Sequence, residues 1–168
     1  DENGNKIPDG SYSYRISSTD AAGNGVSKEL RGLQIDTRVA TVFVTASSDG
    51  FSPNRDGFAD SIEFKPYVNL EEGIQSWTLE MVHEQASVQK TFSGTGKIPG
   101  AITWDGKGNG SLAREGDYTA VMTVNYFKGN RPQAESTPFK LDVSAPAIDL
   151  SVSPQPFPPD NDGVDDEL

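Results

Sequence analysis

DYTAVMTVNYF, residues 117–127, alternates apolar and polar side chains along its length. Its apolar residues fall at every second position and would share one face of an extended strand: Tyr118, Ala120, Met122, Val124 and Tyr126. This period of two is typical of a strand that buries one face and exposes the other. The stretch therefore predicts a long, half-buried β-strand.

The stretches around it carry the same pattern between turn signals. In IQSWTLEMVH (74–83) the side chains of Trp77, Leu79 and Met81 share a face, and Pro66 in SIEFKPYV (61–68) indicates a strand edge or a bulge. The other predicted strands are VATVFVTAS (39–47), VQKTF (88–92), AITW (101–104) and TPFKLDV (137–143). No stretch keeps an apolar period of 3.6 residues. The sequence therefore predicts an all-β fold, an antiparallel two-sheet sandwich.

Three motifs recur along the chain at a constant spacing of 106 residues, since 109 − 3, 139 − 33 and 157 − 51 all equal 106. The pairs are NGNKIPDGSY (3–12) with NGSLAREGDY (109–118), LQIDT (33–37) with FKLDV (139–143), and FSPNRDGFAD (51–60) with FPPDNDGVDD (157–166). A period of about 100 residues matches an immunoglobulin-like domain and is far too long for a solenoid repeat.

This spacing predicts tandem immunoglobulin-like, or fibronectin III-like, sandwich repeats. Residues 1–38 would close one repeat, residues 39–144 would form a complete repeat, and residues 145–168 would open a third. The connecting segments are too short for free movement. We therefore expect a stiff rod in which neighbouring repeats of the same chain are each other's partners.

The composition narrows the class of partner further. The formal net charge is −11, from 25 acidic against 14 basic residues. Nucleic acid is an improbable partner, because phosphate binding needs clustered lysine and arginine. The chain has no cysteine, which excludes disulfides and thiolate chemistry. No apolar run approaches the roughly 18 residues of a membrane span, so direct membrane insertion is not expected.

FSPNRDGFADSIEF (51–64) has polar residues spaced like those of an EF-type calcium loop. Counted from Ser52, the ligand positions fall at Asn54, Asp56, the Phe58 carbonyl, Asp60 and Glu63, with Gly57 at the sharp turn. The second copy supplies Asp160, Asp162, the Val164 carbonyl and Asp166. Both copies lack the opening aspartate, because Ser52 and Pro158 stand there.

Two interpretations of this loop remain open from the sequence. Its hard oxygen ligands, without nitrogen or sulfur, favour calcium over zinc. A metal-free turn explains the same residues if Asn54 and Asp56 accept hydrogen bonds from backbone amides and Gly57 takes a positive φ.

Two later motifs give the chain a family resemblance: W-D-G at 104–106 and N-G followed by G-x-Y within 109–118. Together with F-S-P-N-x-D-G-x-x-D, this ordered trio resembles bacterial immunoglobulin-like domains of the flagellar hook-capping (FlgD) type. The first element also resembles C-terminal domains associated with gliding motility and secretion. The resemblance implies a spacer or attachment module, without catalysis, in the bacterial cell envelope, periplasm or extracellular surface.

Catalytic signatures are weak, and the chain is not expected to be an enzyme. His83 is the only histidine, is expected to be incidental, and no G-x-S-x-G element accompanies it. The leading hypothesis is a structural repeat that contacts neighbouring repeats, with another envelope protein or a surface glycan as a further partner. One alternative is a carbohydrate-binding or adhesive module that uses Trp77, Trp104 and nearby tyrosines. Another is an accessory domain of a larger secreted enzyme. Burial of both tryptophan rings would favour the structural repeat.

Overall fold

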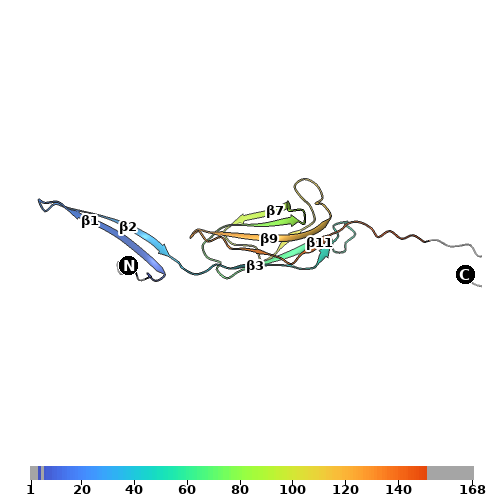
Figure 1. Cartoon of the computed structure of the whole chain (residues 1–168), viewed down its shortest axis with the longest axis horizontal. Helices are drawn as coiled ribbons and strands as arrows, with labels where there is room; N and C mark the ends of the chain where they lie inside the picture. Colours follow the sequence, from blue (N-terminus) through green and yellow to red (C-terminus); the bar gives the residue numbers. More distant parts are fainter. Residues whose placement is uncertain (1–3, 5, 151–168) are drawn as a thin grey trace, which may run out of the picture.

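In the computed structural model, which describes residues 4 and 6–150, every helix or strand assigned is a β-strand (Figure 1). The strands form a separate hairpin and a sandwich of two sheets. The predicted all-β class is confirmed, and all sheet pairings but one within the described residues are antiparallel.

The hairpin consists of β1 (Gly10–Thr19) and β2 (Gly25–Ile35). It lies beyond one end of the sandwich, and the described C-terminal residues leave the sandwich at the opposite end (Figure 1). Its strands pair only with each other within the described residues.

The larger sheet of the sandwich has the strand order β4-β11-β9-β6-β7, and β10 also pairs with β9. Its members are β4 (Gly50–Phe51), β6 (Ile74–His83), β7 (Ser87–Thr95), β9 (Gly116–Tyr126), β10 (Gln133–Glu135) and β11 (Phe139–Leu141). The pairing of β4 with β11 is parallel. The strands predicted from alternation are all present, whereas β4 and β10 were not expected.

The smaller sheet has the order β3-β5-β8, with β3 (Val42–Ala46), β5 (Ile62–Val68) and β8 (Ile102–Trp104). In the described part of the chain, β8 pairs only with residues 62–64 of β5. Pro66 therefore has a neighbouring strand on one side only, where it pairs with Val44. This is the edge position that a residue without an N–H can occupy.

The core lies between the two sheets. The alternating residues of β9 are 0–2% exposed, and Leu79 and Met81 of β6 are fully buried. Trp104 lies at the centre of an aromatic cluster in which the ring centroids of Phe51, Tyr118 and Phe139 are 5.3, 5.2 and 6.2 Å from its own. This cluster closes the end of the core next to the 52–61 loop and the 105–115 segment.

Candidate functional site

The 52–61 loop is a turn whose side chains bind its own backbone. Asn54 Oδ1 accepts a hydrogen bond from the Asp56 N–H at 3.0 Å, and Asp56 Oδ1 accepts one from the Phe58 N–H at 2.8 Å. The Asn54 amide also donates to Asp56 Oδ2 at 2.9 Å. The pKa of the Asp56 carboxyl is lowered most by the hydrogen bond from the Asn54 amide and next by the hydrogen bond from the Phe58 N–H.

Asp60 closes this turn from the other side. Its Oδ1 accepts the Arg55 N–H at 2.6 Å and its Oδ2 accepts the Gly57 N–H at 2.9 Å. Gly57 has φ +90°, as the turn interpretation predicted, and Arg55 and Ala59 also take positive φ, at 68° and 51°. A non-glycine residue in this conformation is strained, so the side-chain hydrogen bonds must hold the turn in place.

The ligand set predicted for calcium is only partly brought together. Asn54, Asp56, Phe58 and Asp60 share the turn, whereas Glu63 lies on β5. The Glu63 carboxylate contacts Lys65 Nζ at 3.4 Å. Among residues 4 and 6–150, no three histidine or acidic side chains are placed to hold one metal ion. Asp160, Asp162, Val164 and Asp166 lie outside the described residues.

In the loop as folded, the Asp56 and Asp60 carboxylates accept hydrogen bonds from backbone N–H groups and from the Asn54 amide, as the metal-free turn interpretation predicts. Calcium binding by this loop stays a prediction, and melting experiments decide it.

Asp60→Ala is expected to lower the free energy of unfolding by about 1–2 kcal/mol, because charge-assisted hydrogen bonds to two amides are lost. Asp60→Asn keeps one acceptor and is the matched control, with a smaller loss. Each variant and the parent are melted in millimolar calcium and again in chelator. We expect the parent curves to coincide. A rise of several degrees in calcium that Asp60→Ala abolishes would contradict the metal-free turn.

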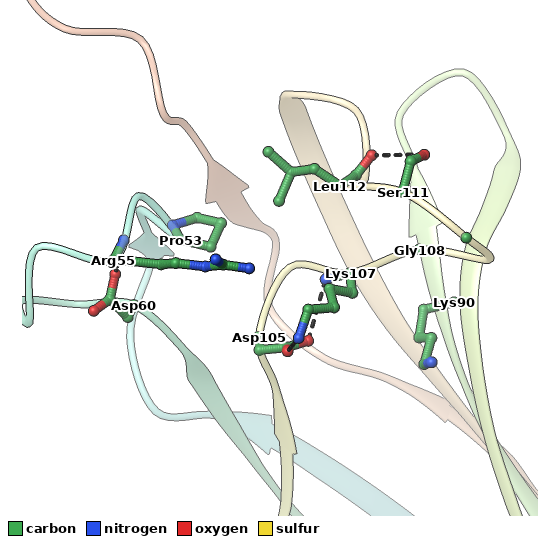
Figure 2. A pocket seen from close by; sticks show the side chains of 10 residues that line it. Pro53, Arg55, Asp60, Lys90, Asp105, Lys107, Gly108, Ser111 and Leu112 are labelled. Carbon is green, nitrogen blue, oxygen red and sulfur yellow. Dashed lines mark hydrogen bonds and ion pairs between the residues drawn. The ribbon is translucent and has the colours of Figure 1, made fainter.

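A cavity of about 590 Å³ opens between this loop and the 105–112 loop (Figure 2). Lys90 of β7 forms part of its wall, and the Arg55 side chain reaches across it towards Asp105 and Lys107 (Figure 2). Lys107 donates to the Asp105 carboxylate and lowers the pKa of that carboxyl. Within the described part of the chain, neither Arg55 nor Lys90 has an acidic partner within ion-pair distance.

This cavity is lined by three cationic and two anionic side chains, in a protein whose net charge is −11. It could attract a small anion, but it places no histidine or cysteine beside a second reactive group. Sequence reasoning missed it because Arg55, Lys90 and Lys107 come from separate parts of the chain. Gly106 allows the close approach of the two loops, since a Cβ there would lie 2.5 Å from Pro53 Cγ and its φ is +74°.

Both tryptophans are buried: Trp104 is fully buried and Trp77 is 6% exposed. The Trp104 Nε1–H donates to the Lys107 carbonyl at 2.8 Å. The alternative of a sugar platform on these two rings is therefore wrong, because neither ring has a face in solvent on which a sugar could stack.

His83 has a structural role that the sequence did not indicate. The ring is 2% exposed, its Nδ1 accepts the Gln85 N–H at 3.1 Å, and its Nε2 lies 3.0 Å from the Glu115 carbonyl oxygen. Since Nδ1 accepts, Nε2 carries the proton and donates to Glu115. The imidazole thus joins the end of β6 to the start of β9.

The segment between the hairpin and the sandwich is held by ionic and amide contacts. Arg38 binds both carboxylate oxygens of Asp36 at 3.0 Å. Lys128 Nζ, from the loop after β9, donates to the Arg38 carbonyl at 2.6 Å and lies 3.3 Å from Asp36 Oδ2. Arg38 first, and Lys128 in addition, hold the pKa of the Asp36 carboxyl far below its usual range. Asn69 binds the backbone of Val39 and Thr41 on the sandwich side.

No family model matches the chain, and no curated protein matches it. The resemblance to the flagellar hook-capping domain therefore stays a prediction. Within the described residues, no helix is long and apolar enough to cross a membrane.

Solved structures do resemble the fold. One is the crystal structure of a tetra-tandem repeat in the extending region of a large adhesion protein, with a TM-score of 0.52 and 18% identity over 81% of this chain. The chain spans 32% of that structure. Another is dimeric latent PorU from Porphyromonas gingivalis, with a TM-score of 0.46 and 17% identity over 80% of this chain and 12% of that one. The first similarity supports the fold alone.

Proposed function

We propose that this protein is a repeat module of a bacterial surface protein and acts as a rigid spacer between its neighbours. The observation that carries this proposal is the set of contacts at residues 36–41, where the chain enters the sandwich. The described chain leaves at the opposite end (Figure 1). A module with its two connections at opposite ends lengthens a protein, and a held junction keeps the modules in line.

The junction is short and held on both sides. Asp36 and Arg38 continue from β2, whereas Lys128 and Asn69 belong to loops of the sandwich. The Lys128 side chain is 18% and the Asp36 side chain 27% exposed, so their contact is partly shielded from solvent and salt. These contacts restrict the direction in which the hairpin leaves the sandwich.

The adhesion-protein structure gives further support for a location at the cell surface. That structure is described as a tandem repeat in an extending region, which is the role proposed here. We propose neighbouring repeats as the principal partners, and an envelope protein or a surface glycan as a partner of the whole array. We propose a structural rather than a catalytic role, which agrees with the use of His83 to join two strands.

Lys128→Ala is expected to widen the range of angles between the hairpin and the sandwich. The chain has no cysteine, so spin labels at Ser18→Cys and Ser93→Cys report only the distance between these two exposed positions. The distance distribution should broaden in Lys128→Ala, while the melting temperature changes little, because ion pairs near the surface contribute little to stability. Lys97→Ala removes the same charge elsewhere and should leave the distribution unchanged.

An equally broad distribution in the parent protein would overturn the spacer proposal, since the hairpin would then move freely about residues 36–41. Unchanged distances in Lys128→Ala would show that the lysine does not hold the junction.

A further inference from the structure

The hairpin has one apolar face that nothing covers in the described structure. Tyr12 lies opposite Leu33 and Tyr14 lies opposite Leu30, so the four side chains share a face. Tyr14 and Leu30 are each 59% exposed. The same face continues with Ile16, Val26 and Ile35, and it also carries one charged residue, Lys28, opposite Ile16. Two-stranded hairpins are at best marginally stable alone, and contiguous apolar patches of this kind mark contact surfaces.

The hairpin repeats the construction of β9 with β10 and β11, 106 residues later. At one end of the hairpin, the cross-strand partners are Gly10 with Ile35 and Tyr12 with Leu33. The equivalent partners in β9 and β11 are Gly116 with Leu141 and Tyr118 with Phe139. At the other end Ser17 pairs with Ser27, and Thr123 pairs with Gln133. Adding 106 to each hairpin residue gives its counterpart, so the two registers are the same.

The hydrogen bonds at the ends of the strands also repeat. The Tyr12 hydroxyl donates to the Pro8 carbonyl, and the Tyr118 hydroxyl donates to the Arg114 carbonyl. The Thr37 N–H donates to the Asp9 carboxylate at 2.9 Å, and the Val143 N–H donates to the Glu115 carboxylate at 2.7 Å. Each pair again differs by 106. The turns agree as well, with φ +89° at Gly23 and +91° at Gly129.

In the complete sandwich, the equivalent face is buried. Tyr118 is 1% and Phe139 2% exposed, and the Phe139 ring lies 5.2 Å from that of Phe64 on β5. The edge of β9 that faces away from β11 pairs with β6. The segment 42–104, from β3 to β8, thus supplies both the opposite sheet and the neighbouring strand.

We infer that the β1–β2 hairpin closes a second sandwich, whose other half is a copy of the β3–β8 pattern in a preceding repeat of the same polypeptide. This inference rests on the proposed function, because it names the partner on the far side of the junction. The occupant would cover the Tyr14–Leu30 face with its smaller sheet. Its β6-like strand would pair with the free edge of β1.

A second copy of the hairpin is a poorer occupant. A face of two strands, each about 10 residues long, covers roughly 330 Å², so a symmetric pair would bury about 700 Å². This is well below the roughly 1,200 Å² of a stable interface. Such a pair would also leave the edge of β1 without hydrogen bonds.

The occupant resembles residues 39–106 without being identical to them. Tyr14 and Leu30 stand where the complete sandwich has Ala120 and Ser136. The surface that receives them must therefore be more hollow at these two points than the one formed by β3 and β5.

The test extends the full chain by a copy of residues 39–106 placed directly before residue 1, which restores the 106-residue period. One version keeps the native hairpin. A second carries Tyr14→Ala and Leu30→Ser, so that its hairpin presents the same residues as Ala120 and Ser136, which the segment 39–106 covers in the complete sandwich. Hydrogen exchange of the β1 amides is measured with and without the extension. We expect exchange at least 100-fold slower in the extended second version, and a smaller slowing in the first.

Two controls separate the faces of the hairpin. Ile16→Asp, on the apolar face, should abolish the protection in the extended chain, whereas Ser17→Asp, on the opposite face, should leave it. Equal exchange with and without the extension in both versions would overturn the inference, as would a stable dimer of the full chain with protected hairpins. Neither result changes the spin-label distances at the junction, so the spacer proposal is tested separately.

Discussion

Trp104→Ala is expected to lower the free energy of unfolding by about 3–5 kcal/mol, as large-to-small changes in a core do. The ring is fully buried, and three aromatic rings surround it. Its removal leaves a cavity that these rigid neighbours cannot fill. The 105–112 loop also loses the hydrogen bond from Nε1 to the Lys107 carbonyl.

Urea denaturation followed by the fluorescence of the remaining Trp77 measures this loss. Trp104→Phe is the matched control, because it keeps most of the apolar volume but leaves the Lys107 carbonyl without its donor. We expect its cost to lie at about 1–3 kcal/mol, the range for an unpaired polar group. A midpoint for Trp104→Ala within error of the parent would show that the ring does not close the core.

The strands that were predicted correctly are those whose two faces have different neighbours. In β6 and β9 one face meets the opposite sheet and the other meets solvent, and the sequence alternates accordingly. β4 has only two residues, and β10 contains a single apolar residue, Ala134, so neither strand shows a recognisable period. The pairing of β4 with β11 also joins segments that are far apart in the chain, and local propensity carries no information about it.

The candidate site was predicted less completely than the strands. Asn54, Asp56 and Asp60 were identified as a group, but a metal ion and a backbone amide are both bound by the same oxygen atoms. Only the positions of the N–H groups distinguish the two, and these depend on the positive φ angles at Arg55 and Ala59. The contacts of Lys128 with Asp36 and Arg38 were missed because they join a loop of the sandwich to the end of β2.

The 106-residue period was the most informative feature of the sequence. It identifies which residues of the two copies are equivalent, whereas amino-acid propensity indicates only a residue's preference for a strand or a turn. Side chains differ between the copies, as Tyr14 and Ala120 show, but the register and the terminal hydrogen bonds coincide. Backbone pairing thus follows the spacing of the glycine, tyrosine and aspartate motifs more closely than it follows the apolar residues between them.

Trp77→Ala is also expected to cost about 3–5 kcal/mol, although its ring is held in another way. The indole lies against Gly94, its cross-strand partner on β7. A Cβ on Gly94 would lie 2.6 Å from Trp77 Cζ2. The ring therefore fills space that exists only because β7 has a glycine there. Among the described residues, the Trp77 Nε1–H is the buried side-chain polar group without a hydrogen-bond partner.

Two comparisons follow from this geometry. Trp77→Phe should cost less than Trp104→Phe, because no hydrogen bond is lost with the Trp77 indole N–H. Gly94→Ala should destabilise the parent by about 1–3 kcal/mol through overpacking, yet cost much less in the Trp77→Ala background, where the ring is gone. A double-mutant cycle on chemical denaturation measures this coupling. Additive effects of the two substitutions, or an unchanged melting temperature in Trp77→Ala, would mean that the ring does not pack across β7, and the pairing of β6 with β7 would then have to be reassigned.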